Sequence, residues 1–126
     1  AGRVLVAAFI NASAVAEKIL EYGADACIVC AGTEQKYSME DVLAAGAVID
    51  ALRKISQSPL TLDDLGHHSE QLFGRAKSNL ARACARSAHA QRIKALGMGE
   101  DIGYCLQMDI ANTVPQYCDG VILRGS

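Results

Sequence analysis

The residues best suited to chemistry lie in one polar segment, residues 32–41, at the start of a predicted helix. Its three carboxylates belong to Glu34, Glu40 and Asp41. Carboxylate oxygens are the ligands that Mg²⁺ prefers, and a bound cation would neutralise the charge of a phosphate group. The phosphate-binding candidates are Gly32, Thr33 and Ser38, next to free helix N–H groups that can hold phosphate oxygens. The segment predicts a site for magnesium and phosphate, in which the three carboxylates are both metal ligands and catalytic groups.

A purely structural interpretation of the same segment stays open. The Ser38 hydroxyl can cap the first turn of the helix, and Asp41, three residues further on, can return a hydrogen bond to the Ser38 backbone. Glu34 would then be a solvated loop residue. In that case the chain would be an α/β domain that binds an anion or a partner chain without catalysis.

A second polar position follows the first apolar run of the chain, residues 3–10. Asn11 and Ser13 stand before a predicted helix, where either side chain can cap the helix or contact a substrate. Ligands of open α/β sheets bind beyond the carboxyl ends of the strands, and this rule selects both polar positions. Asn11 and Ser13 are therefore predicted to join residues 32–41 in binding a small anionic phosphorylated substrate.

Basic side chains gather in one predicted helical region and would give it a positive face. They are Arg75, Lys77, Arg82, Arg86, Arg92 and Lys94. One or two of them could reach a doubly charged substrate, because arginine matches the geometry of phosphate and sulfonate oxygens. His67 and His68 are adjacent on a helix and do not share a face, so they do not indicate a metal site.

Alternating strand and helix patterns must position these residues. Nearly continuous apolar runs at residues 3–10 and 26–31 predict strands that are covered on both faces. The predicted helices are one that ends at Gly23, one over residues 38–52, and helical segments over 62–96 that break near 74–78 and 87 and stop at Gly97. This order predicts a three-layer α/β/α fold with a mostly parallel or mixed sheet.

The C-terminal part of the chain has two distinct patterns. Residues 102–108 alternate like a half-buried strand, but residues 100–107 fit a short helix equally well. Residues 114–117 and 121–123 flank Asp119 and Gly120, a tight-turn dipeptide, and therefore predict a C-terminal hairpin.

Composition and charge narrow the class of protein. The chain has 126 residues, 51% of them hydrophobic, and a formal net charge of −2, which favours one domain with an apolar core. Its apolar runs are shorter than the roughly 20 residues that cross a bilayer, and it has no basic excess for nucleic acid. We expect a cytoplasmic protein that binds neither a membrane nor nucleic acid. Cys27 and Cys30 are expected to be small core residues of a strand rather than a redox pair.

Three stretches of the chain together resemble the 2-phosphosulfolactate phosphatase family. The first is Phe9-Ile10-Asn11-Ala12-Ser13-Ala14-Val15-Ala16, the second is Ile28-Val29-Cys30-Ala31-Gly32-Thr33-Glu34 with Tyr37-Ser38-Met39-Glu40-Asp41, and the third is Leu96-Gly97 with Glu100-Asp101-Ile102, Cys105-Leu106-Gln107 and Val114-Pro115. The resemblance covers essentially the whole chain. Its most specific part is Cys-Ala-Gly-Thr-Glu followed by Ser-x-Glu-Asp.

The resemblance implies an α/β/α fold and magnesium-dependent hydrolysis of 2-phosphosulfolactate, or of a related 2-hydroxy acid phosphate, to the hydroxy acid and phosphate. In organisms that make coenzyme M this reaction is a step towards it. The likeness is to the C-terminal half of the family. Residues 1–123 are thus expected to form that half of the domain, with 124–126 as a vector-derived tail, and pairing with an N-terminal half or a second copy is expected.

Overall fold

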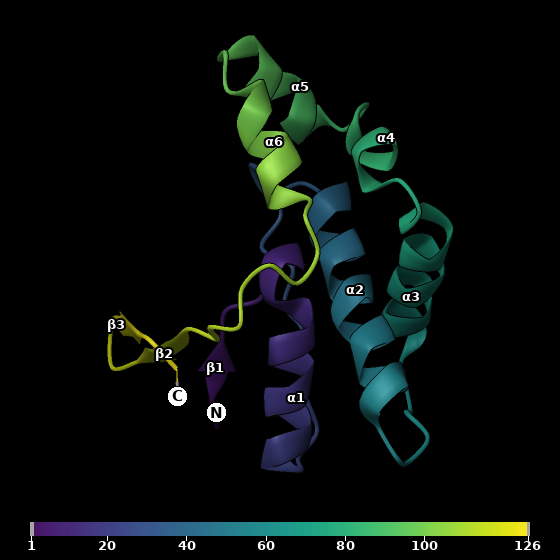
Figure 1. Cartoon of the computed structure of the whole chain (residues 1–126), viewed down its shortest axis with the longest axis vertical. Helices are drawn as coiled ribbons and strands as arrows, with labels where there is room; N and C mark the ends of the chain where they lie inside the picture. The colour runs from purple at the N-terminus through teal and green to yellow at the C-terminus, as the bar shows by residue number, and fades with distance from the viewer. Residues whose placement is uncertain (1, 126) are drawn as a thin grey trace.

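The structure is a computed structural model that describes residues 2–125, apart from the side-chain surroundings of residues 89, 99 and 101. Its helices are α1 Ala12–Tyr22, α2 Met39–Ile55, α3 Asp64–Ala76, α4 Leu80–Cys84, α5 Ala88–Ala95 and α6 Gly99–Cys105, with a 3-10 helix at Phe9–Asn11. Figure 1 shows α2 between α1 and α3, with α4, α5 and α6 beyond the N-terminal end of α2. None of the helices within the described residues is long and apolar enough to span a membrane.

The helix boundaries follow from local chemistry that the sequence displays. Ser38, Asp63 and Ser87 each accept a hydrogen bond from the backbone N–H three residues further on, which caps α2, α3 and α5. Gly23 and Gly97 adopt φ values of 64° and 76°, a region that costs glycine nothing, and they end α1 and α5. The predicted helices, their breaks and both glycine stops are confirmed.

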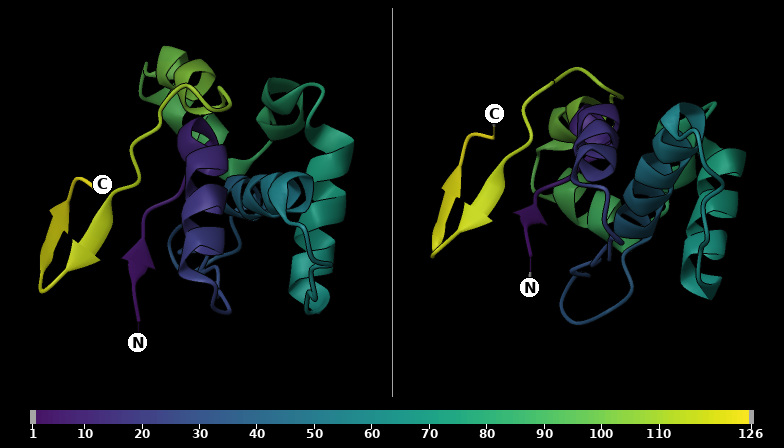
Figure 2. Two further views of the ribbon diagram at one scale, coloured as in Figure 1. Left: turned by 60° about the horizontal axis from the view of Figure 1, so that its bottom comes forward. Right: turned by 90° about the horizontal axis from the view of Figure 1, so that it is seen from below.

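Close packing of α2 against α3 builds the centre of the core. A Cβ atom at Gly46 of α2 would lie 2.2 Å from the Ser69 carbonyl oxygen and 2.6 Å from Phe73 Cβ, so only glycine permits this approach. One face of α2 is apolar and buried, namely Val42, Ala45, Ile49 and Leu52. Val15 and Ala16 of α1 cover another side of α2, as the views in Figure 2 show for the helices themselves.

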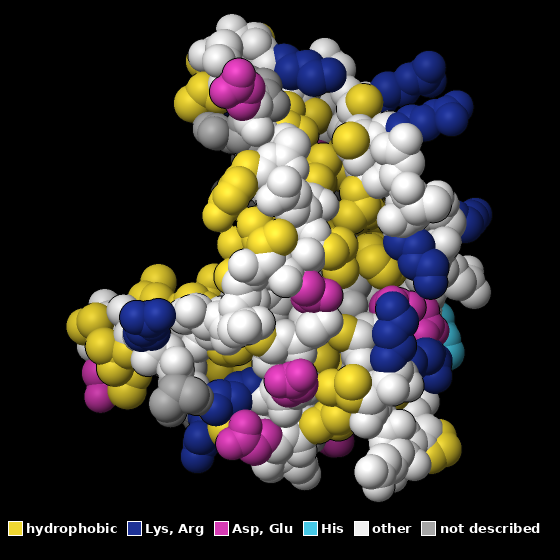
Figure 3. Space-filling view, viewed as in Figure 1, with side chains coloured by type: hydrophobic (Ala, Val, Ile, Leu, Met, Phe, Trp, Pro, Cys, Tyr) yellow, Lys and Arg dark blue, Asp and Glu magenta, His cyan; other side chains and the backbone are white. Residues whose placement is uncertain are grey.

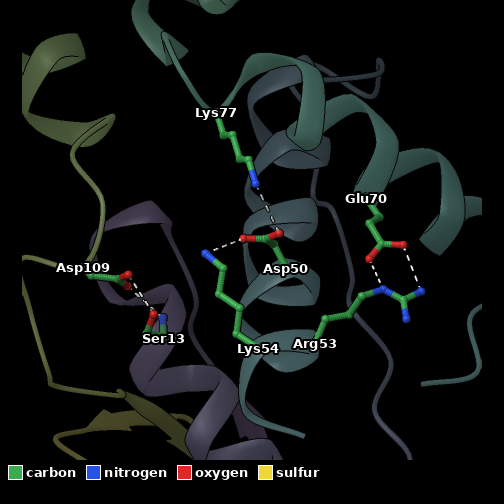
Figure 4. A network of polar contacts seen from close by, with 7 residues as sticks. All are labelled: Ser13, Asp50, Arg53, Lys54, Glu70, Lys77 and Asp109. Atoms are coloured by element: carbon green, nitrogen blue, oxygen red, sulfur yellow. Dashed lines mark hydrogen bonds and ion pairs between the residues drawn. The ribbon is translucent and has the colours of Figure 1, made fainter. Parts of the chain in front are cut away.

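Charged side chains add a polar seam between α2 and α3 (Figure 4). Arg53 of α2 pairs with Glu70 of α3, with 3.0 Å between Arg53 Nη2 and Glu70 Oε1. Asp50 lies 3.0 Å from Lys54 Nζ and 3.9 Å from Lys77 Nζ. Because solvent-exposed ion pairs contribute only about 0–1 kcal/mol each, the buried apolar face supplies most of the stability of this helix pair.

The sheet differs from the predicted one. It contains the three strands β1 Val4–Leu5, β2 Gln116–Cys118 and β3 Val121–Leu123, in the order β1-β2-β3. Both pairings are antiparallel, with Val4 opposite Tyr117 and Tyr117 opposite Ile122. The prediction of a three-layer α/β/α fold with a mostly parallel or mixed sheet is therefore wrong, although strands and helices are both present and the C-terminal hairpin is confirmed.

The error has a physical source in residues 26–31. This run is extended but is not a strand, because none of the described strands lies alongside to pair with it. Cys27 and Cys30 are exposed, so the prediction that they are core residues is wrong. The predicted strand 3–10 is shortened to Val4–Leu5, since the backbone turns into the 3-10 helix at Phe9.

The segment after α6 closes over the start of α1. The Asp109 N–H donates to the Phe9 carbonyl at 3.1 Å, and the Ala111 N–H donates to the Ile10 carbonyl at 2.8 Å. Residues 99–105 form α6, so the helical alternative for this region is the observed one. Ser126 of the predicted tail lies outside the described residues.

Candidate functional site

The polar segment is a tight turn fastened to the N-terminus of α2. Thr33 and Lys36 form a two-residue bridge, with N···O distances of 3.0 Å in both directions. Gly32 has a φ of 77°, and a Cβ there would lie 2.6 Å from the Lys36 carbonyl oxygen. The Gly32 N–H donates to Asp41 Oδ2 at 2.8 Å. Asp41 therefore holds the turn against α2 instead of returning a hydrogen bond to Ser38.

Glu40 joins the N-termini of two helices. Its carboxylate accepts hydrogen bonds from the hydroxyls of Ser38, at 3.4 Å, and of Ser87, the cap of α5. Ser38 and Ser87 are buried, and Glu40 is half-buried. The Glu40 side chain thus lies between two helix N-termini, each of which carries partial positive charge.

Glu34 pairs with Arg92 of α5. Both side chains are exposed, Glu34 by 67% and Arg92 by 59%. Arg92 is one of the basic residues predicted to form a positive face. Figure 3 shows Lys and Arg side chains over the side of the molecule formed by α3, α4 and α5.

A cavity of about 250 Å³ lies beside Glu40 and Asp41. Residues 7–9 and residues of α2, α4, α5 and α6 line it. Its remaining lining is mainly apolar, namely Ala7, Ala8, Phe9, Ala44, Cys84, Ala90, Ile93, Ile102, Cys105 and Leu106. Burial, with a smaller contribution from the Glu40 charge, raises the pKa of the Cys84 thiol to about 11. The arrangement places two carboxylates at the edge of an apolar cavity, where charges interact more strongly than in water.

The three predicted metal ligands are not gathered around one point. Glu34 pairs with Arg92, Asp41 accepts from a backbone N–H, and Glu40 accepts from two hydroxyls. Across the described residues, no group of three or more His, Cys, Asp or Glu side chains could hold a metal ion. These carboxylates therefore do not fit a complete magnesium site formed by this chain alone.

Asn11 connects the backbone of residues 6–8 with that of Thr113. Its side-chain oxygen accepts from the Ala8 N–H at 2.8 Å, and its amide nitrogen donates to the carbonyls of Val6 and Thr113, both at 3.1 Å. The side chain makes no capping bond to α1, so the capping alternative for Asn11 is wrong. Its predicted contact with substrate stays a prediction.

Ser13 is bound by a residue that sequence reasoning missed. Asp109 accepts from the Ser13 N–H at 2.8 Å and from its hydroxyl at 2.7 Å, as Figure 4 shows. Asp109 thus caps α1 from the other end of the chain, with a left-handed φ of 56°. Such a distant cap leaves no local signal in the sequence, whereas Ser87 could have been found as a cap residue before a helix.

Comparison with known proteins identifies the family. The family model described as 2-phosphosulpholactate phosphatase matches residues 1–120. The chain is 36% identical over 122 residues to a "Probable 2-phosphosulfolactate phosphatase" of Caldanaerobacter subterraneus, covering 97% of this chain and 50% of that protein. It is 35% identical over 120 residues to a protein of the same description from Thermotoga maritima, covering 95% of this chain and 50% of that protein.

These relatives are described as phosphatases, which gives the general class. The chain belongs to the 2-phosphosulfolactate phosphatase family. It spans about half the length of the curated relatives that it matches.

Proposed function

We propose that this chain forms part of a phosphatase that hydrolyses 2-phosphosulfolactate, or a related 2-hydroxy acid phosphate, to the hydroxy acid and phosphate. The observation that carries the proposal is the placement of Glu40 and Asp41 in the first turn of α2, at the edge of a cavity of about 250 Å³. Family membership supplies the reaction class. A cytoplasmic location without membrane or nucleic-acid partners belongs to the same proposal.

These residues would position the substrate and stabilise the negative charge of the transferred phosphoryl group, the two effects that dominate catalysis of phosphoryl transfer. Thr33 and Ser38 would donate to phosphate oxygens at the N-terminus of α2, where the helix dipole favours an anion. Arg92 would contact the second anionic group of the substrate, since its guanidinium fits planar oxygen pairs. These roles use residues that lie on the turn 32–41 and on the facing helix α5.

Magnesium dependence is part of the proposal. Glu40 and Asp41 would contribute ligands, and the remaining ligands would come from outside the described residues. A bound Mg²⁺ neutralises negative charge on a phosphate group. Glu34 would act as the counter-charge of Arg92.

The test is phosphate release from 2-phosphosulfolactate, with and without Mg²⁺, by this chain mixed with the half of the Caldanaerobacter relative that it does not match. Glu40→Gln and Asp41→Asn should each lower turnover by a factor of at least about 10², as expected when charge stabilisation is lost. Asp64→Asn is the matched control, because Asp64 is a first-turn carboxylate of α3 that does not line the cavity. Full turnover in Glu40→Gln and Asp41→Asn would overturn the proposal.

A non-catalytic anion-binding or interaction domain is the second candidate. It is favoured by one observation, that Ser38, Glu40 and Asp41 are all engaged in hydrogen bonds that stabilise the fold. In that case Ser38→Ala would lower the free energy of unfolding by about 1 kcal/mol without changing phosphate affinity. Isothermal titration with inorganic phosphate would separate the two readings.

A further inference from the structure

A long open groove separates β1 from the extended residues 24–31. Its volume is about 950 Å³, and its walls are residues 2–5 on one side and 24–31 on the other. The floor is formed by apolar residues of α1 and α2, namely Val15, Ile19, Ala44, Ala45 and Val48. The groove is thus an apolar trough whose two walls are both extended backbone.

Both walls have backbone groups without a protein partner. Among the described residues, 24–31 make no backbone–backbone hydrogen bond. β1 pairs with β2 on one side only and is an edge of the sheet. Unpaired extended backbone of this kind is a template for the addition of another strand.

The apolar side chains of the same wall are exposed. Val29 is 83% exposed and Ile28 is 40% exposed. A contiguous run of apolar residues in extended conformation is typical of a segment that is covered on both faces. The exposure of this run indicates a surface to which another polypeptide segment binds.

We propose that this groove binds an extended apolar segment from the half of the family polypeptide that this chain does not match, whether joined to this chain or supplied separately. The relatives are twice as long as their matched part, so each has a second half of similar length available. The segment lies between β1 and residues 24–31, pairs with their free backbone groups, and buries Ile28 and Val29.

The position of the groove also connects it with the candidate site. Asp41 and Ala44 line both the groove and the smaller cavity beside Glu40. An occupant of the groove therefore lies beside Asp41, one of the two carboxylates proposed to contribute magnesium ligands. This last consequence rests on the proposed function, whereas the binding itself does not.

Hydrogen exchange and sedimentation test the binding without any assay of hydrolysis. The chain is measured alone and mixed with the unmatched half of the Caldanaerobacter relative, produced as a separate polypeptide. The expected result is a one-to-one complex in which amides 26–31 and those of β1 become protected. The relative's own two halves, mixed in the same way, provide the reference.

Two exposed positions supply matched variants. Val29→Lys, in the groove wall, should weaken the complex at least tenfold, because it places a charge in the interface. Leu65→Lys, at a 74% exposed position on α3 and outside the groove lining, should change the affinity less than twofold. Four outcomes would each overturn the proposal. The mixture could form no complex, or a complex that leaves the amides of residues 26–31 unprotected. Both variants could lose affinity equally, or the chain could form a dimer with itself that covers the groove.

Discussion

Two apolar runs of this chain have opposite surroundings. In α2, residues 42–52 are buried except for Ala44 and Asp50, which are half-buried, whereas every residue of the run 26–31 is exposed. The first run meets α1 and α3, and the second faces the open groove. The difference shows that burial of an apolar run is favourable, but that it occurs only where neighbouring elements pack against the run.

The largest expected effect comes from truncating a side chain in the buried run. Leu43 is fully buried, so Leu43→Ala should lower the free energy of unfolding by about 2–5 kcal/mol. Val29→Ala, at an 83% exposed position, should change it by less than about 0.5 kcal/mol. Urea unfolding followed by circular dichroism would measure both, and similar values would contradict the contrast between the two runs.

The next effect concerns pH and the buried thiol. Because the pKa of Cys84 is raised from 9.0 to about 11 in the fold, its contribution to stability is present below about pH 9 and is lost as pH rises through about 11. That loss should amount to about 2–3 kcal/mol, from the size of the pKa shift. Unfolding free energies of wild type and Cys84→Ala should converge between pH 8 and 11, while Cys118→Ala, at an exposed cysteine, should follow wild type. Parallel curves for wild type and Cys84→Ala would contradict the assignment.

A smaller effect is expected from two helical glycines. Gly46→Ala forces a Cβ against the Ser69 carbonyl oxygen and should lower the free energy of unfolding by about 1–3 kcal/mol, through overpacking of α2 against α3. Gly74→Ala, on the exposed side of α3 with nothing within 4 Å, should stabilise the protein by about 0.5–1 kcal/mol. Thermal unfolding would compare the pair, and the same sign for both would show that the close approach of α2 and α3 is misassigned.

The smallest effect is expected at a helix end. Asp63 accepts from the Gly66 N–H at 2.7 Å, so Asp63→Ala should lower the free energy of unfolding by about 1 kcal/mol. Asp63→Asn retains a capping oxygen and should recover most of the loss. Equal destabilisation by both substitutions would assign the effect to charge rather than to the cap. Chemical denaturation resolves a difference of this size.

The sequence predicted those structural features that depend on residues close to one another along the chain. Ser38 and Gly97 predicted a helix start and a helix end, because caps and left-handed turns use contacts within a few residues. The Asp119-Gly120 turn likewise predicted the hairpin. The prediction of a mostly parallel or mixed sheet was wrong, because strand pairing depends on a partner, and an apolar run such as 26–31 does not say which segment lies beside it.

The candidate site was predictable to a similar degree. Glu40 and Asp41 could be placed at the start of a helix from their position after Ser38. The pairing of Glu34 with Arg92 and of Glu40 with Ser87 could not, because these partners are 58 and 47 residues apart. The sequence pattern therefore located the polar turn and the helix start that follows it, while the contacts of Glu34 and Glu40 depend on the position of α5.

The closing segment at residues 109–113 has a consequence for the order in which the molecule assembles. Its bonds to Ser13 and Asn11 join positions 96 and 102 residues apart, whereas α1, α2 and α3 follow one another along the chain. Closing so long a loop costs entropy before any contact forms. We therefore expect the three helices to associate early in refolding and the closing segment to dock last. In the native protein the amides of Asp109 and Ala111 should open and exchange sooner than those in the middle of α2.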